Sequence, residues 1–242
     1  DIDVLNVNEA LSGMPFDVEF ISFDDVEKNG IDKYDVIINA GREFSSWSGG
    51  ENWNCVDVVD KITKWTYEGG TFIGVNAPSY CSGNDYSFRL EHILGVDIDN
   101  GERYCHNKIT PECTESELIC EGTDAKIKDY LYVSKPDTEV LLSKDGEPII
   151  TKHNFGKGCG FYFSYFRTGN ENNRTLMNMI VGSDCAKNYK YISSNPNCEC
   201  AYFPNNNKLI VINNTNETQT TSVITENGVR EFTLDGFDTV IL

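Results

Sequence analysis

The sequence predicts an α/β fold, in which helices cover both faces of a mostly parallel sheet, followed by a small antiparallel β-sandwich domain. Two apolar runs without strict alternation, at residues 35–39 and 71–75, are typical of strands that are buried on both faces. A helical pattern at residues 52–68 lies between them. Short alternating runs after Tyr191, separated by turns rich in asparagine and glycine, indicate the β-sandwich.

The composition excludes several classes of partner. The chain has 242 residues, enough for one large domain or for a domain with a small companion, and it carries 20 Lys and Arg against 38 Asp and Glu. A formal charge of -18 repels phosphate backbones and anionic lipids, so neither nucleic acid nor a membrane is expected as a partner. Residues 1–10 lack the pattern of a secretory signal, and no run of about 18 apolar residues occurs. We therefore expect a cytoplasmic protein.

The first 50 residues predict a helix end, two strands and a candidate site. Residues 8–13 are typical of a helix that a glycine terminates, and residues 16–23 alternate as a half-buried strand does. The buried strand 35–39 then leads into the loop 39–50. Ligands of open α/β sheets bind beside the loops that leave the carboxyl ends of the strands, so this loop is the first candidate for a site.

The next segment completes a β-loop-α-β unit. The helix predicted at 52–68 ends at Gly69-Gly70 and leads into the strand 71–75, and such a unit is expected to be right-handed. The residues expected on its buried side are spaced three or four apart. They are Val56, Val59, Ile62, Thr63 and Thr66.

The turn after the second buried strand resembles that of a known enzyme architecture. In class I glutamine amidotransferases and related hydrolases, which have a flavodoxin-like three-layer α/β/α fold, the corresponding turn raises a cysteine nucleophile above the sheet. Here Asn76 stands at that position, and an asparagine side chain forms neither a thiolate nor a thioester. Cys81 lies outside the turn. The catalytic histidine of that architecture is missing as well, because Tyr165-Phe166-Arg167 occupies its place. His153 lies before the tight turn at 155–158, on the wrong strand.

The rest of the chain divides into two parts. The first part continues with predicted helices and strands, which are the helix 88–94, strands at 130–133, 139–142, 148–151 and 161–164, and a closing helix at 171–181. Five short strands are predicted after Tyr191, at 200–203, 209–213, 220–225, 230–234 and 239–242. We therefore expect an amidotransferase-like α/β/α domain at residues 1–187 and a small β-sandwich domain at 188–242.

Nine cysteines at irregular spacing favour free thiols in a reducing compartment. Two groups are weighed as metal ligands: Cys105-His106 with Cys113 and Cys120, and Cys198-Glu199-Cys200. Neither has the paired two-residue spacing that lets one turn present two thiolates to zinc, so no metal is expected.

Four stretches together resemble the middle and carboxy-terminal domains of 1,3-β-galactosyl-N-acetylhexosamine phosphorylases, the lacto-N-biose phosphorylase family. They are residues 8–31, 35–53, 67–79 and 191–221. The resemblance implies an enzyme with an amino-terminal (β/α)8 barrel, an amidotransferase-like domain and a small β-domain. It also implies glycosyltransferase-type, inverting phosphorolysis of galactosyl-β1,3-N-acetylhexosamine to α-galactose 1-phosphate, with inorganic phosphate as co-substrate and no cofactor. In two places the chain departs from the pattern, at Ala77 and at the segment 42–44.

No residue of the chain takes the role of general acid in this resemblance, because the acid and the main sugar contacts of the family lie on the barrel. The chain is therefore expected to be a non-catalytic part of the enzyme, inactive alone, that shapes the barrel's site and supports subunit contacts in a homodimer or higher homo-oligomer. Its candidates for contact with the galactoside or with another subunit are the residues at the strand ends. They are Asn39, Arg42, Trp47 and Asn76.

Two other interpretations stay open from the sequence. The chain could be a purely structural oligomerisation module, like the amidotransferase-like domain of some β-galactosidases, with its strand-end loops in a subunit interface. It could also be a thiol hydrolase that uses Cys81 as its nucleophile.

Overall fold

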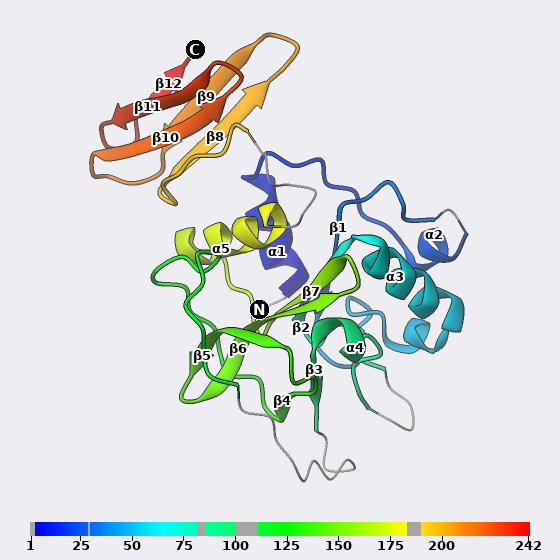
Figure 1. Cartoon of the computed structure of the whole chain (residues 1–242). Coiled ribbons are helices and arrows are strands. Elements are labelled where there is room, and N and C mark those ends of the chain that lie inside the picture. Colours follow the sequence, from blue (N-terminus) through cyan, green and yellow to red (C-terminus); the bar gives the residue numbers. More distant parts are fainter. Residues whose placement is uncertain (1–2, 29, 82–85, 100–110, 183–189) are drawn as a thin grey trace.

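The computed structural model describes residues 3–28, 30–81, 86–99, 111–182 and 190–242 (Figure 1). The Cys105-His106 pair and the cysteine at position 185 lie outside these residues. Within them, no helix combines the length and the apolar character needed to cross a membrane.

A five-stranded sheet forms the centre of the first 182 residues. Its strand order is β1-β2-β7-β6-β5. β1 (Val36–Gly41), β2 (Thr71–Asn76) and β7 (Gly158–Phe163) are parallel, whereas β6 (Glu147–Phe155) and β5 (Glu139–Lys144) are antiparallel to their neighbours. A hairpin turn at Asp145-Gly146 joins β5 to β6, and both residues have positive φ. The strands predicted at 35–39 and 71–75 are therefore present. β2 is buried throughout as expected, whereas β1 lies at the edge of the sheet and is only half-buried at residues 36–39.

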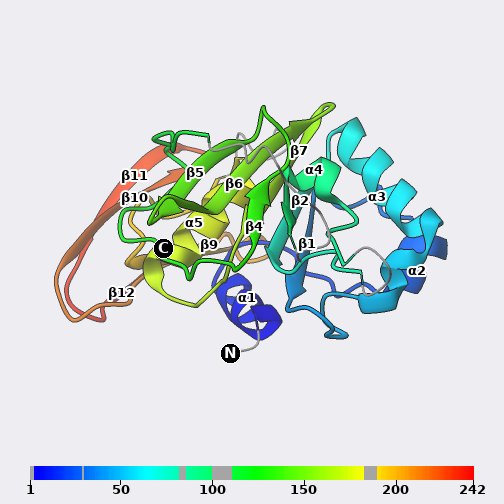
Figure 2. The ribbon, with the colours of Figure 1, turned by 90° about the horizontal axis from the view of Figure 1, so that it is seen from below.

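Helices pack on both faces of this sheet, and each face has its own core (Figures 1 and 2). α3 (Val56–Glu68) and the short α4 (Glu91–Leu94) cover one face, and α1 (Asp3–Ser12) and α5 (Asn170–Val181) cover the other. Neighbouring residues of β2 alternate between the two cores, since Phe72 faces α3 and α4 whereas Ile73 faces α1 and α5. The result is a mixed α/β arrangement of three layers.

Two predictions about these elements were wrong in detail. Residues 16–22 do not form a strand, and α2 (Phe23–Lys28) begins where the strand was expected to end. Ile21 and Phe23 pack against a core while Phe20 is 77% exposed, so the alternating pattern belongs to an irregular segment instead of a strand. The helix expected at 52–68 is broken at Cys55 into the 3₁₀ turn η1 (Gly50–Asn54) and α3, so that Val56 at the first turn is exposed.

A two-stranded sheet extends the first part beside α4. It pairs β3 (Val96–Ile98) with β4 (Leu131–Val133), so the strand predicted at 130–133 does not join the central sheet. Helix α4 is shorter than the helix expected at 88–94, and Phe88, Leu90 and Ile93 are all buried.

The last 52 residues form two small antiparallel sheets that enclose a separate core, and they lie beyond α1 and α5 (Figure 1). One sheet has the order β12-β9-β8 and the other pairs β10 with β11. The five strands are β8 (Cys198–Phe203), β9 (Lys208–Asn213), β10 (Gln219–Thr225), β11 (Gly228–Leu234) and β12 (Thr239–Ile241). The five predicted strands are confirmed. Such short strands can be predicted from local sequence, because they depend on alternating apolar residues and on the asparagine-rich turns between them.

Candidate functional site

The carboxyl ends of β1 and β2 bring the predicted strand-end residues to one place. Gly41 pairs with Asn76 in the register of these strands, so the loop after β1 starts beside the turn after β2. Asn76 is 3% exposed and has a φ of 66°. This left-handed conformation is uncommon for residues other than glycine, and asparagine tolerates it better than most. A sharp turn is therefore present where a nucleophile was considered, but its side chain is an amide.

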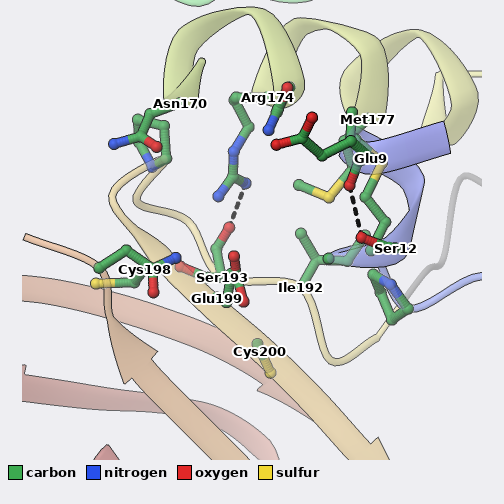
Figure 3. Close-up of a pocket in the computed structure, with 17 residues that line it drawn as sticks. Glu9, Ser12, Asn170, Arg174, Met177, Ile192, Ser193, Cys198, Glu199 and Cys200 are labelled. Atoms are coloured by element: carbon green, nitrogen blue, oxygen red, sulfur yellow. Dashed lines mark hydrogen bonds between the residues drawn. The ribbon is translucent and has the colours of Figure 1, made fainter. Parts of the chain in front are cut away.

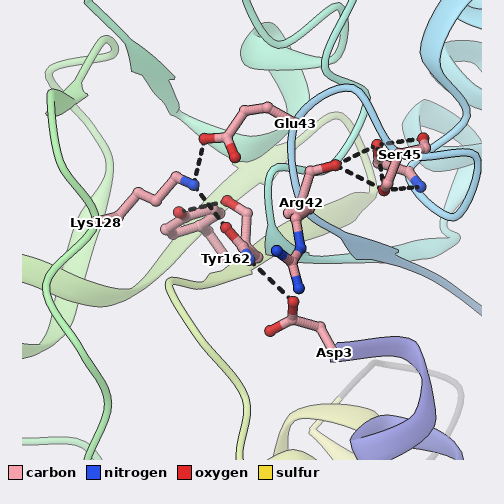
Figure 4. Close-up of polar contacts among 8 residues, drawn as sticks. Asp3, Arg42, Glu43, Ser45, Lys128 and Tyr162 are labelled. Atoms are coloured by element: carbon pink, nitrogen blue, oxygen red, sulfur yellow. Dashed lines mark hydrogen bonds and ion pairs between the residues drawn. The ribbon is translucent and has the colours of Figure 1, made fainter. Parts of the chain in front are cut away.

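Both polar atoms of the Asn76 side chain and its carbonyl oxygen have hydrogen-bond partners (Figure 4). Its Nδ2 donates to Asp3 Oδ2 at 2.9 Å, and its Oδ1 accepts from Lys128 Nζ at 2.6 Å. The Tyr162 hydroxyl donates to the Asn76 carbonyl oxygen at 2.8 Å. Since buried amides are stable only when they are hydrogen-bonded, these contacts fix the side chain in one orientation.

The Lys128 ammonium links this turn to the loop after β1. The Lys128 side chain is 4% exposed and pairs with the carboxylate of Glu43, which is 31% exposed. Its Nζ also lies 5.2 Å from the ring centroid of Tyr165. A buried ammonium needs such compensation. Glu43 is therefore held against the turn, and the backbone on each side of it is positioned as a consequence.

Two tyrosine hydroxyls at this edge stay protonated at neutral pH. Burial raises the pKa of Tyr162 well above its usual value, which suits its role as a donor to the Asn76 carbonyl. Burial, with a smaller contribution from the Glu43 carboxylate, raises the pKa of Tyr80 to about 12. Both groups can donate hydrogen bonds, and neither can act as a base near pH 7.

Phe44, the residue after Glu43, presents an aromatic ring at the surface. It is 67% exposed and has a φ of 57°. Its ring contacts Tyr80 edge-on, with centroids 5.3 Å apart, and Tyr86 with centroids 6.0 Å apart. A bulky residue with positive φ is strained, and such outliers concentrate at functional sites.

The other predicted site residues have different surroundings. Asn39 is half-buried, and its Oδ1 accepts from the Ser79 amide at 2.8 Å, so it ties β1 to the turn. Arg42 is exposed, and its carbonyl accepts from the hydroxyls of Ser45 and Ser48. Trp47 is 55% exposed. The contact of these residues with a ligand or a subunit stays a prediction.

The thiol and imidazole considered from the sequence are engaged elsewhere. Cys81 is buried, and its Sγ donates to Asn54 Oδ1 at 2.9 Å. His153 lies on β6 and pairs with Gly160 of β7, which in turn pairs with Phe72 of β2. His153 is therefore level with Phe72, four residues before Asn76 at the end of β2. Its Nδ1 lies 3.0 Å from the Ile93 carbonyl oxygen and its Nε2 lies 3.3 Å from Asp137. Asn76, Cys81 and His153 thus do not form the amidotransferase arrangement of nucleophile and base.

The sequence did not reveal the residues that hold this edge together. Asp3, Glu43 and Lys128 come from distant parts of the chain, and none of them was predicted to be a site residue. Lys128 follows a polar segment without periodicity, so no local signal indicated its burial.

A hollow of about 390 Å³ lies between the two parts of the chain (Figure 3). Carboxylates of Glu9 and Glu199 line it together with Arg174 from α5. The guanidinium of Arg174 donates to the carbonyl oxygens of Ser193 and Asn195, the latter at 2.8 Å. Arg174 therefore connects α5 to the segment that leads into β8.

Two cysteines beside this hollow belong to the core of the C-terminal sheets. Cys198 and Cys200 are both buried there. Burial raises the pKa of the Cys198 thiol, and it raises the pKa of Cys200 to about 12. Both groups are therefore packed thiols at neutral pH, and the thiolate form that binds metals is disfavoured.

Comparison with solved structures supports the fold. The chain is similar to a β-galactosidase from Rahnella sp. R3, with a TM-score of 0.55 and 18% identity, over 99% of this chain and 36% of that one. It is also similar to the cytoplasmic protein STM1381 from Salmonella typhimurium, with a TM-score of 0.53 and 14% identity, over 76% of this chain and 88% of that one.

Comparison with curated proteins and family models identifies relatives. A D-galactosyl-β-1→4-L-rhamnose phosphorylase from Lachnoclostridium phytofermentans is 38% identical over 99% of this chain. The 1,3-β-galactosyl-N-acetylhexosamine phosphorylase Cphy3030 of the same organism is 35% identical over 90% of it. This chain spans about a third of their length, 34% and 31%. The models of the lacto-N-biose phosphorylase central and C-terminal domains match residues 2–187 and 191–242. The chain therefore belongs to the lacto-N-biose phosphorylase family.

Proposed function

We propose that the chain is the central and C-terminal part of a galactoside phosphorylase and that it does not itself carry the catalytic groups. The observation that carries this proposal is the combination of the two family matches with an amide, Asn76, in the buried turn after β2. The central part would then be an amidotransferase-like domain without that architecture's nucleophile. The remaining two thirds of the enzyme, with a (β/α)8 barrel, would supply the general acid.

The reaction assigns clear requirements to that remaining part. Inverting phosphorolysis needs a carboxylic acid that protonates the leaving oxygen, while phosphate attacks the anomeric carbon from the opposite face. The product would be α-galactose 1-phosphate. The strand-end loops that carry Arg42, Phe44 and Trp47 would cover this site or contact a second subunit, in a cytoplasmic homo-oligomer.

Two β-galactosides are candidates for the substrate. Galactosyl-β1,3-N-acetylhexosamine is the expectation from the sequence, and two phosphorylases of that name are 34% and 35% identical. Galactosyl-β1,4-L-rhamnose is the second candidate, since the phosphorylase named for it is 38% identical over 99% of the chain. All of these names share the galactosyl group and differ in the second sugar.

A direct assay separates these candidates. The full-length gene product is incubated with inorganic phosphate and either disaccharide, and galactose 1-phosphate is measured over time. We expect phosphate-dependent release with at least one disaccharide, and the ratio of kcat/KM values identifies the preferred second sugar. Hydrolysis to free galactose without phosphate dependence would contradict the phosphorylase proposal.

A further inference from the structure

The exposed aromatic ring at the carboxyl edge of the sheet is the feature that the proposed function leaves unexplained. Phe44 is 67% exposed and adopts a φ of 57°, so the protein accepts backbone strain to present an apolar side chain to solvent. Exposure and positive φ also occur together at Phe237, so what sets Phe44 apart is the pair of tyrosine rings that it contacts.

The surroundings of Phe44 hold its ring in place. Tyr80 meets it at an interplanar angle of 80° and Tyr86 at 68°, and Tyr80 is itself 5% exposed. The preceding residue, Glu43, is tied to the buried Lys128. The Phe44 ring is therefore held in place in two ways. Tyr80 and Tyr86 pack against it, and the ion pair between Glu43 and Lys128 fixes the backbone just before it.

The same place offers a hydrogen-bond donor. Among the residues that the structure describes, the Tyr80 hydroxyl has no hydrogen-bond partner, although nine-tenths of the side chain is buried. A fixed ring beside an unused phenol suits a molecule with an apolar face and hydroxyl groups, which is the character of a pyranose. The formal charge of -18 disfavours an anion at this surface and does not affect a neutral sugar.

We propose that Phe44, with Tyr80 and Tyr86, forms a platform for the acceptor sugar, the second sugar of the galactoside and the one released in phosphorolysis. This inference rests on the proposed function. In an inverting reaction the acceptor and the attacking phosphate lie on opposite sides of the galactosyl carbon, so a domain that covers the site from outside meets the outer sugar. That sugar is also the part in which the named relatives differ, as rhamnose or N-acetylhexosamine.

The test uses the full-length enzyme in the synthetic direction, with galactose 1-phosphate and the acceptor varied separately. Phe44→Ala is expected to raise the KM for the acceptor by roughly three- to tenfold, the loss that corresponds to one aromatic contact, and to leave the KM for galactose 1-phosphate within twofold. Phe44→Tyr keeps the ring and is expected to retain the acceptor KM within twofold.

Phe237→Ala is a closely matched control. Phe237 has a φ of 58° and is 70% exposed, like Phe44, but it lies in the C-terminal sheets. We expect it to leave both KM values unchanged.

Three results for Phe44→Ala would overturn the platform. They are an unchanged acceptor KM, an equal rise in both KM values, and a change in oligomeric mass in place of a KM effect. Absence of phosphorolysis in the wild-type enzyme would overturn the proposed function and the platform together, whereas an active wild type with an indifferent Phe44→Ala overturns the platform alone.

Discussion

The ammonium of Lys128 donates a hydrogen bond to the Asn76 side-chain oxygen at 2.6 Å, across 52 positions of the chain. This contact joins the strained turn after β2 to a segment that packs beside the sheet. It also gives the amide of Asn76 a structural role, at the turn where the sequence analysis considered a nucleophile. Four predictions concern the contacts around this turn, the half-buried His92 and the connection between the two parts.

Removal of the Lys128 charge should destabilise the protein markedly. Lys128→Met leaves the half-buried Glu43 carboxylate and the Asn76 amide without their partner, and we expect a loss of about 2–4 kcal/mol in the free energy of unfolding. Urea denaturation measures it. Lys144→Met is the control. The Lys144 side chain is 42% exposed and that of its partner Asp124 is 71% exposed, so this ion pair should contribute less than about 1 kcal/mol. Equal effects of the two substitutions would contradict the structural role of Lys128.

Two substitutions at Asn76 separate the cost of its contacts from the cost of its backbone. Asn76→Ala and Asn76→Gly both remove the bonds to Asp3 and Lys128, but only alanine suffers at a φ of 66°. We expect the alanine variant to be less stable than the glycine variant by about 1 kcal/mol. Thermal unfolding of both variants at one pH provides the comparison, and equal midpoints would show that the turn relaxes out of the left-handed region.

The half-buried His92 should make stability depend on pH in the mildly acidic range. Burial lowers the pKa of His92, and its Nε2 lies 2.9 Å from the Thr63 hydroxyl oxygen. In the unfolded chain the pKa of His92 is about 6.5, so the unfolded state binds the proton more readily than the folded state does. The free energy of unfolding is therefore expected to fall as the pH drops below this value and to level off below the folded pKa.

A His92→Gln variant tests this assignment. Its free energy of unfolding should vary less than that of the wild type between pH 8 and pH 5. The measurement at pH 8, where the histidine is neutral in both states, provides the reference for any loss of packing. Parallel pH profiles for the two proteins would exclude His92 as the cause.

Arg174 should couple the unfolding of the two parts of the chain. Its guanidinium binds the carbonyls of Ser193 and Asn195, and the Ser193 hydroxyl lies 2.7 Å from that of Thr221 in β10. Arg174→Met removes this connection. Differential scanning calorimetry is expected to show two separated transitions where the wild type shows overlapping ones. Arg167→Met, at an exposed arginine just before α5, serves as the control; the same splitting in both variants would argue against a specific role.

Local patterns predicted the strands well because apolar runs and turn residues are read within a few positions. The strands around Ile37, Ile73 and Phe161 and the five C-terminal strands follow directly from such runs. Residues 16–22 were misread because alternation describes which side chains are buried and does not say whether the backbone finds a partner.

The sequence predicted that the ends of the two strands lie side by side, but not which contacts hold them together. Asn39, Arg42 and Asn76 do meet at one edge of the sheet, because parallel strands end together. Lys128 and Asp3 reach this edge through packing of α1 and of an irregular segment, which no periodicity encodes. The exposure and strain of Phe44 are properties of the folded loop and could not be read from its residue type.

The most direct test of the central claim measures phosphate-dependent release of galactose 1-phosphate by two proteins, the full-length enzyme and residues 1–242 alone, on the same β-galactoside. We predict turnover by the full-length enzyme and none by residues 1–242. Turnover by residues 1–242 in isolation would contradict the account, because it would place the catalytic groups within this chain.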